Sequence, residues 1–222
     1  MQVSTKGCVS IARHEGIVPA PYLDPVNIWT FGIGHTAMSG DPDPAAMPRG
    51  MPEDVNAAVV KAVELFQRHI RKYEADVARK VTIPLKPHEF DMLVSFHFNT
   101  GGILSSSGVP KLNAGDKLGA WHVFSQWNKG TIDGQKVVLP GLVSRRADEK
   151  HTFFTGEYDD DPIPIWKVNA NNKYSRLFRS MSPEELIHLL EKDAIQSTRG
   201  SSDSLGAILS RLFSFMTKGG PA

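Results

Sequence analysis

The chain contains very little cysteine and carries almost no net charge. Cys8 is the single cysteine among 222 residues, which excludes an intrachain disulfide and a metal site built from several cysteines. The 25 Lys and Arg residues are nearly balanced by 24 Asp and Glu residues, for a formal net charge of +1. Because no strongly basic field is present, no nucleic-acid partner is predicted.

Signals for export and membrane insertion are also missing. Residues 1–15 show no basic region followed by an apolar run and a small-residue cleavage site. No stretch reaches the ~18 apolar residues that a membrane-spanning helix requires. We therefore expect a chain made in the cytoplasm without a signal peptide. If its target lies beyond the membrane, another component must deliver it.

The apolar residues predict a mainly helical molecule built around one long helix. Pro52 suits the first position of this helix, which is expected to run to about Lys80. At ~40 Å it would be as long as a small domain, so we expect it to join two lobes. Its apolar face is formed by residues at steps of three and four: Val55, Val59, Ala62, Phe66, Ile70, Tyr73 and Val77. Shorter helices are predicted over residues 3–14, 87–98, 116–127 and 141–154.

A small hairpin is predicted between the first helix and the long one. Two short β-prone runs flank residues 24–27, whose Asp, Pro and Asn suit a tight turn. Residues 129–138 are expected to form a turn or a second short hairpin. Together these elements predict an α+β fold that is mainly α.

One group of polar residues near the N-terminus has a pattern that suits catalysis. Glu15 closes the first predicted helix, Asp24 lies in the hairpin turn, and Thr30 follows in the next strand. Cleavage of a glycosidic bond needs one carboxyl that donates a proton and one ionised carboxylate that stabilises positive charge or activates water. Glu15, at a packed helix end, is the better candidate for the acid. Spacing alone leaves open that Asp24 only forms the turn and that Glu15 is merely solvated.

The residues around this pattern extend it into a longer motif: Glu15-Gly16, Tyr22-Leu-Asp24 and Ile28-Trp-Thr30-Phe-Gly-Ile-Gly-His35-Thr36. This motif resembles the catalytic motif of the phage-type lysozymes (glycoside hydrolase family 24, the endolysins or muramidases). Residues 81–101, 111–116 and 140–149 resemble later segments of the family, in the same order. The resemblance covers about residues 3–156. It departs at Asn27, where many members carry Gly, and residues 157–222 do not match.

The resemblance implies a set of site residues. Glu15, Asp24 and Thr30 match the catalytic Glu, Asp and Thr of the family. Thr36 and Phe96 fall where the family lines its sugar-binding cleft, although Phe96 suits an ordinary core position equally well. No cofactor or metal is expected, because the carboxylates themselves supply the acid and the base. The Arg145-Arg146 pair is expected to cap a helix or to pair with acidic neighbours.

The resemblance also implies a fold and an activity. The fold would be lysozyme-like, with a small N-terminal β-hairpin lobe and a helical C-terminal lobe joined by the long helix. The activity would be hydrolysis of the β-1,4 bond between N-acetylmuramic acid and N-acetylglucosamine in peptidoglycan glycan strands. Two alternatives remain: a lytic transglycosylase acting on the same bond, and a non-catalytic wall-binding or virion component. Asp24 and Thr30 argue against the first, and an intact set of Glu15, Asp24 and Thr30 argues against the second.

The chain is expected to divide into a catalytic domain, residues 1–156, and a partly helical extension, residues 157–222. Within the extension, Ser182 and Glu185 predict a helix start. Residues 205–216 place Leu, Ile, Phe and Met side chains on one helical face, which is expected to dock on the body, a partner or a membrane surface. The resemblance implies a monomer that is released with the help of a holin and acts on the cell wall in the host periplasm.

Overall fold

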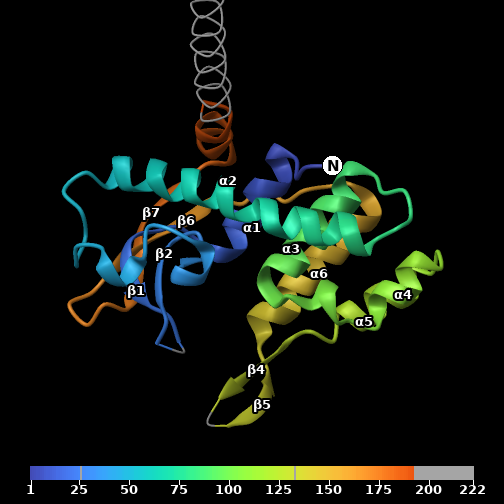
Figure 1. Ribbon diagram of the computed structural model, residues 1–222. Coiled ribbons are helices and arrows are strands. Elements are labelled where there is room, and N and C mark those ends of the chain that lie inside the picture. Colours follow the sequence, from blue (N-terminus) through green and yellow to red (C-terminus); the bar gives the residue numbers. More distant parts are fainter. Residues whose placement is uncertain (26, 133, 193–222) are drawn as a thin grey trace, which may run out of the picture.

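The computed structural model describes residues 1–25, 27–132 and 134–192 of the chain. It shows two lobes side by side along a long helix, α2 (Val55–Lys80), which joins them. The strands within residues 18–32 and 163–181 lie under the first half of α2, and the helices within residues 87–155 lie under its second half (Figure 1). This confirms the predicted mainly α, α+β architecture with a long helix between the lobes. Within the described residues, no helix combines the length and the apolarity needed to cross a membrane.

Helix α1 (Thr5–Glu15) begins at a side-chain cap and ends at a glycine. The Ser4 hydroxyl accepts a hydrogen bond from the Gly7 amide, which satisfies one of the free N–H groups of the first turn. Gly16 follows with φ +69°, a left-handed conformation that disfavours residues with a Cβ atom. The chain therefore turns sharply immediately after Glu15.

The N-terminal lobe contains a three-stranded antiparallel sheet in the order β1-β2-β3. The predicted hairpin is present as β1 (Val18–Leu23) and β2 (Trp29–Gly32), and a short β3 (His35–Thr36) adds a third strand. Asn27, in the β1–β2 turn, has φ +62°, a conformation that Asn tolerates better than most residues. The departure from the family's usual Gly is thus accommodated. Short 3-10 helices at Ala37–Ser39 and Pro44–Ala46 lead toward α2.

The helical lobe is built around α3 (Pro87–Thr100), which is buried along most of its length. Helices α4 (Gly108–Asn113), α5 (Lys117–Phe124) and α6 (Pro140–Thr155) complete this lobe, after a 3-10 turn at Gly102–Leu104. Strands β4 (Lys129–Ile132) and β5 (Gln135–Val138) form the second hairpin. Trp121, Phe124 and Phe153 are fully buried against one another.

The chain beyond α6 folds back onto the N-terminal lobe. Gly156, in the left-handed conformation, ends α6, and β6 (Ile163–Val168) and β7 (Tyr174–Met181) then form an antiparallel hairpin. This hairpin was not predicted, because a proline inside β6 and two register shifts hide the usual strand pattern. Residues 183–192 are helical and begin with the predicted Ser182–Glu185 capping box. The predicted amphipathic face at 205–216 lies outside the described residues.

A buried histidine in α2 makes the stability of the fold depend on pH. His69 is 8% exposed and lies against Tyr73 and Phe98. Burial, together with nearby Lys72 and His35, lowers the pKa of His69 from 6.5 to about 4. Because this folded-state pKa lies below the unfolded one, the unfolded chain gains a proton first as the pH falls. The contribution of neutral, buried His69 to the free energy of unfolding is therefore fully present above about pH 6.5 and is lost progressively as the pH falls toward 4.

We expect a change from pH 7 to pH 5 to lower the free energy of unfolding by about 2 kcal/mol through His69 alone. His69→Phe should preserve the aromatic packing and remove that part of the pH dependence. Urea unfolding at several pH values measures the slope. His122→Gln, on the exposed side of α5, is the control and should leave the slope unchanged. An unaltered slope in His69→Phe would contradict the assignment.

Candidate active site

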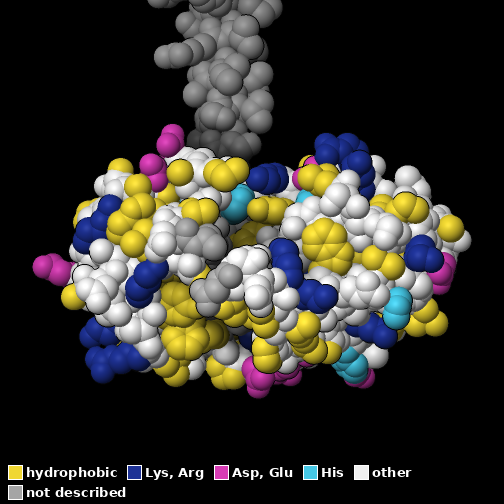
Figure 2. Space-filling model, turned by 90° about the horizontal axis from the view of Figure 1, so that it is seen from below, with side chains coloured by type: hydrophobic (Ala, Val, Ile, Leu, Met, Phe, Trp, Pro, Cys, Tyr) yellow, Lys and Arg dark blue, Asp and Glu magenta, His cyan; other side chains and the backbone are white. Residues whose placement is uncertain are grey.

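A single cleft between the two lobes brings together most of the predicted site residues. It has a volume of about 720 Å³ and is lined by α1, β1, β2, β3, α6 and the β6–β7 hairpin. Seen from below, the molecule is hollowed between its lobes, and hydrophobic side chains gather along the edges of the hollow (Figure 2). Glu15, Asp24, Thr30 and Thr36 all line the cleft.

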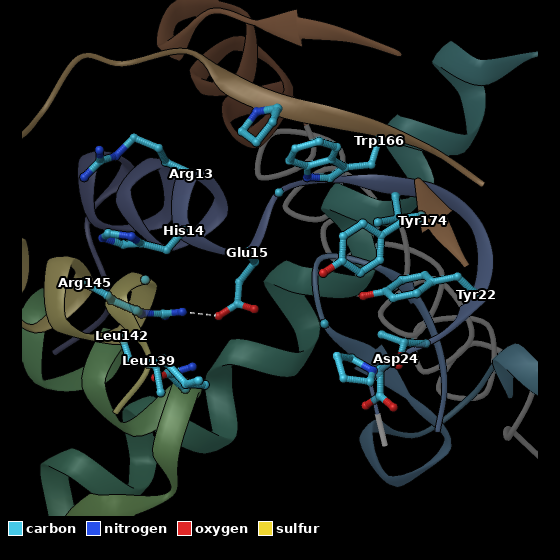
Figure 3. A pocket seen from close by; sticks show the side chains of 18 of the residues that line it. Arg13, His14, Glu15, Tyr22, Asp24, Leu139, Leu142, Arg145, Trp166 and Tyr174 are labelled. Carbon is cyan, nitrogen blue, oxygen red and sulfur yellow. Dashed lines mark hydrogen bonds and ion pairs between the residues drawn. The ribbon is translucent and has the colours of Figure 1, made fainter. Parts of the chain in front are cut away.

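Glu15 is held in the cleft by an arginine from the other lobe. Nη1 of Arg145, on α6, donates to Oε1 of Glu15 at 2.6 Å. The Glu15 side chain is 23% exposed, whereas that of Arg145 is only 5% exposed. The second carboxylate oxygen of Glu15 points away from Arg145 into the cleft (Figure 3). One oxygen is therefore used for positioning, and the other faces the space where a ligand would lie.

Arg145 is itself fixed by a buried carboxylate. Its Nε lies 3.2 Å from Oε1 of Glu149, which also accepts hydrogen bonds from Arg146 and Ser95. Burial disfavours the charged form of Arg145, but Glu15 and Glu149 outweigh it and raise the pKa of Arg145. The guanidinium is thus a permanent positive charge between two carboxylates.

His14, next to Glu15, is a neutral member of the cleft wall. Burial and the nearby charges of Arg145 and Arg13 lower the pKa of His14 to about 3. At neutral pH the imidazole therefore carries no charge that would compete with Arg145 for the Glu15 carboxylate.

Asp24 is positioned by the backbone of its own turn. Its Oδ1 accepts from the Ile28 amide at 2.8 Å, and its amide donates to the Ile28 carbonyl at 3.1 Å. The residue is partly exposed. It lies across the cleft from Glu15, below Tyr22 (Figure 3). The two carboxylates thus occupy different environments, one beside a buried arginine and one in a partly wet turn.

The two threonines lie on neighbouring strands. Thr30, 4% exposed, pairs in register with Tyr22 of β1 and Thr36 of β3. Its hydroxyl donates to the Ile28 carbonyl at 3.1 Å. The Thr36 hydroxyl lies 3.4 Å from that of Ser39. Both threonines line the same cleft as Asp24.

Phe96 does not belong to this site. It is 0% exposed and packs against Phe124, with 4.7 Å between ring centroids, and under the Arg146 guanidinium at 5.1 Å. Because it faces the core side of α3, the expectation that it lines the sugar cleft is wrong. Phe96 instead has the core position that was expected as the alternative. Similarly, His35 is a structural group whose Nε2 lies 2.9 Å from the Pro42 carbonyl.

Several residues of the cleft were not identified from the sequence. Arg145 was expected only to cap a helix or to pair with acidic neighbours, and its contact with Glu15 joins residues 130 positions apart. Trp166 and Tyr174 line the cleft from the extension beyond residue 156. Aromatic side chains on a segment without a matching motif gave no signal for such a role. Within the described ranges, no group of three His, Cys, Asp or Glu side chains is arranged to hold a metal ion.

Two carboxylates facing one cleft of a two-lobed α+β fold are the arrangement that cleavage of a glycosidic bond requires. Comparison with known proteins gives the family. Residues 12–149 match the phage lysozyme family model. The chain is 31% identical over 159 residues to an endolysin of Acyrthosiphon pisum secondary endosymbiont phage 1, covering 69% of this chain and 98% of the relative. The chain therefore belongs to the phage lysozyme family and is a lysozyme, a glycoside hydrolase of peptidoglycan.

Solved structures agree with this assignment. An endolysin of Escherichia coli phage FAHEc1 matches with a TM-score of 0.60 and 31% identity, over 72% of this chain and 97% of its own. The muramidase domain of SpmX from Asticaccaulis excentricus matches with a TM-score of 0.54 and 28% identity, over 69% and 98%. These proteins are matched almost completely, whereas more than a quarter of this chain lies outside each match. The family model ends at residue 149, before the β6–β7 hairpin begins.

Proposed function

We propose that Glu15, Asp24 and Thr30 hydrolyse the β-1,4 bond between N-acetylmuramic acid and N-acetylglucosamine. The observation that supports these roles is their convergence on one cleft, with one carboxylate held across the lobes by Arg145. Glu15 gives a proton to the glycosidic oxygen through the oxygen that faces the cleft. Asp24 stabilises the positive charge that develops on the sugar, or orients the attacking water.

Thr30 completes this arrangement by holding the water. A hydroxyl group has one hydrogen to donate and two lone pairs that accept. The hydrogen of Thr30 is already used by the Ile28 carbonyl, so its lone pairs are left to accept a hydrogen bond from a water. Thr36, on the adjacent strand, contacts the sugar from the same wall.

Asp24→Asn tests the role of the second carboxylate. The asparagine oxygen still accepts from the Ile28 amide, so the turn is preserved while the negative charge is lost. We expect kcat on purified peptidoglycan to fall roughly 100- to 1,000-fold with little change in KM, because charge stabilisation acts in the transition state. Asp160→Asn, at an exposed position, is the matched control. Unchanged kcat in Asp24→Asn would refute the role.

The nature of the reaction is tested by its products. Wild-type protein should clear a suspension of chloroform-treated Gram-negative cells, and mass spectrometry should find reducing-end muropeptides that have gained a water. Anhydro products, lighter by one water, would instead show a lytic transglycosylase. Full wall clearing by Glu15→Gln would refute the catalytic assignment, and a wild-type protein that binds walls without releasing fragments would show a binding component.

We further propose that the enzyme works as a monomer and reaches the host wall after a holin permeabilises the membrane. The relatives named endolysin support action on the host wall, and the monomer and the holin rest on the family resemblance. Expression with and without a holin tests the route, because lysis should require both proteins.

Light scattering on the purified chain tests whether it is a monomer. Removing residues 193–222 tests the role of the predicted amphipathic face. If this face docks on a partner or a membrane surface, wall clearing should fall when these residues are removed.

A further inference from the structure

The β6–β7 hairpin forms a wall of the active-site cleft, although it lies beyond residues 12–149, which match the phage lysozyme family model. Trp166 and Tyr174 face the cleft from one side, opposite Arg145 and Leu142 of α6 (Figure 3). Tyr22, from β1, completes this aromatic wall. The β6–β7 hairpin is therefore part of the site.

The hairpin is attached directly beside Glu15. The Ile17 amide donates to the Pro164 carbonyl and the Trp166 amide donates to the Ile17 carbonyl, both at 2.8 Å. A Cβ atom on Gly16 would lie only 2.4 Å from Nε1 of Trp166. Because Gly16 has no side chain, the indole ring reaches the backbone next to Glu15.

The other end of the hairpin holds the turn that carries Asp24. The Leu23 amide donates to the Asn172 carbonyl at 2.7 Å. Nζ of Lys173 donates to the Asp24 carbonyl and to Oδ1 of Asn27, both at 3.0 Å. The hairpin is thus fixed to the segments that carry both carboxylates, and its cleft-facing side chains are pre-positioned relative to them.

The three aromatic side chains form one continuous surface. The ring centroids of Tyr22 and Tyr174 lie 5.5 Å apart, and those of Trp166 and Tyr174 lie 6.0 Å apart. Tyr174 is 44% exposed, and the two tyrosine hydroxyls point into the space in front of Glu15 (Figure 3). An aromatic ring with an apolar face and a polar tip matches a sugar ring, which has apolar C–H faces and hydroxyl edges.

We propose that Tyr22, Trp166 and Tyr174 form a saccharide subsite that binds a sugar of the glycan strand next to the bond being cleaved. This rests on the proposed function for the identity of the strand. The rings contact the sugar face, and the tyrosine hydroxyls hydrogen-bond to its edge. The β6–β7 hairpin therefore lengthens the substrate-binding surface beyond the part of the chain that matches the lysozyme family model.

Tyr174→Ala tests the subsite, since this exposed side chain can be removed with little effect on folding. The probe is the N-acetylglucosamine hexamer, titrated calorimetrically into Glu15→Gln and into Glu15→Gln with Tyr174→Ala. Loss of one aromatic contact is expected to weaken binding about tenfold. In the otherwise wild-type enzyme, Tyr174→Ala should raise KM on peptidoglycan about tenfold with kcat nearly unchanged. Phe178→Ala, on the same strand and 45% exposed but outside the cleft, should change neither value.

Fluorescence gives an independent readout. Addition of the hexamer should change the tryptophan emission of Glu15→Gln, and Trp166→Phe, which keeps an aromatic ring, should remove most of that change. Equal affinity and equal KM in Tyr174→Ala and wild type would overturn the subsite while leaving hydrolysis intact. A wild-type chain that releases no hydrolytic fragments would overturn the proposed function instead, and the binding titration would still decide the subsite.

Discussion

Replacement of Glu15 by Gln should reduce wall-clearing activity by about 1,000-fold or more while the protein remains folded. Glutamine is close in size to glutamate, but it cannot give a proton to the leaving oxygen, and general acid catalysis contributes roughly 100- to 10,000-fold. The amide oxygen can still accept from Arg145, so the side chain keeps its place. Initial rates of turbidity loss measure the effect.

The matched control is Glu64→Gln, a partly exposed position on α2 whose carboxylate pairs with Lys61. It should clear walls at the wild-type rate. Circular dichroism and the urea midpoint must show that Glu15→Gln is folded. A folded Glu15→Gln protein with more than a tenth of wild-type activity would remove Glu15 from the role of acid.

Replacement of Arg145 by Met should cost about 3 kcal/mol of unfolding free energy and most of the activity. The guanidinium compensates the carboxylates of Glu15 and Glu149, and loss of one partner of a buried ion pair leaves charge uncompensated. The loss of unfolding free energy lies at the lower end of the range usual for a broken buried ion pair, because Glu149 keeps its hydrogen bonds from Arg146 and Ser95. Activity falls because Glu15 loses the contact that orients it.

Urea unfolding and wall clearing measure the two effects on the same preparation. Arg145→Lys should recover part of the stability, since the charge is kept, but less of the activity, since a lysine cannot contact both carboxylates with a rigid planar group. Arg176→Met, at an exposed position on β7, is the control and should behave as wild type. Wild-type stability and activity in Arg145→Met would show that the ion pair contributes to neither.

The elements that could be predicted were those whose signals are local. Apolar residues at steps of three and four mark α2, and the structure places it at 55–80, close to the expected 52–80. The turn residues at 24–27 and the β-prone runs beside them identified β1 and β2 in the same way. By contrast, β6 and β7 are stabilised by packing on β1 and α1, and a local pattern cannot report such support.

The sequence by itself determined the lysozyme motif, the two-lobed plan and the candidates Glu15, Asp24, Thr30 and Thr36. The helices and the hairpin follow from residue type, spacing and periodicity within short stretches of chain. The motif, the catalytic assignment of Glu15, Asp24 and Thr30, and the place of Thr36 follow from the resemblance to the family. Only the tertiary structure decided that Arg145 holds Glu15, that Phe96 lies in the core, and that the extension lines the cleft with Trp166 and Tyr174. These features depend on contacts between residues far apart in the sequence, such as Arg145 and Glu15, which are 130 positions apart. Such contacts are determined by packing and burial and not by local propensity.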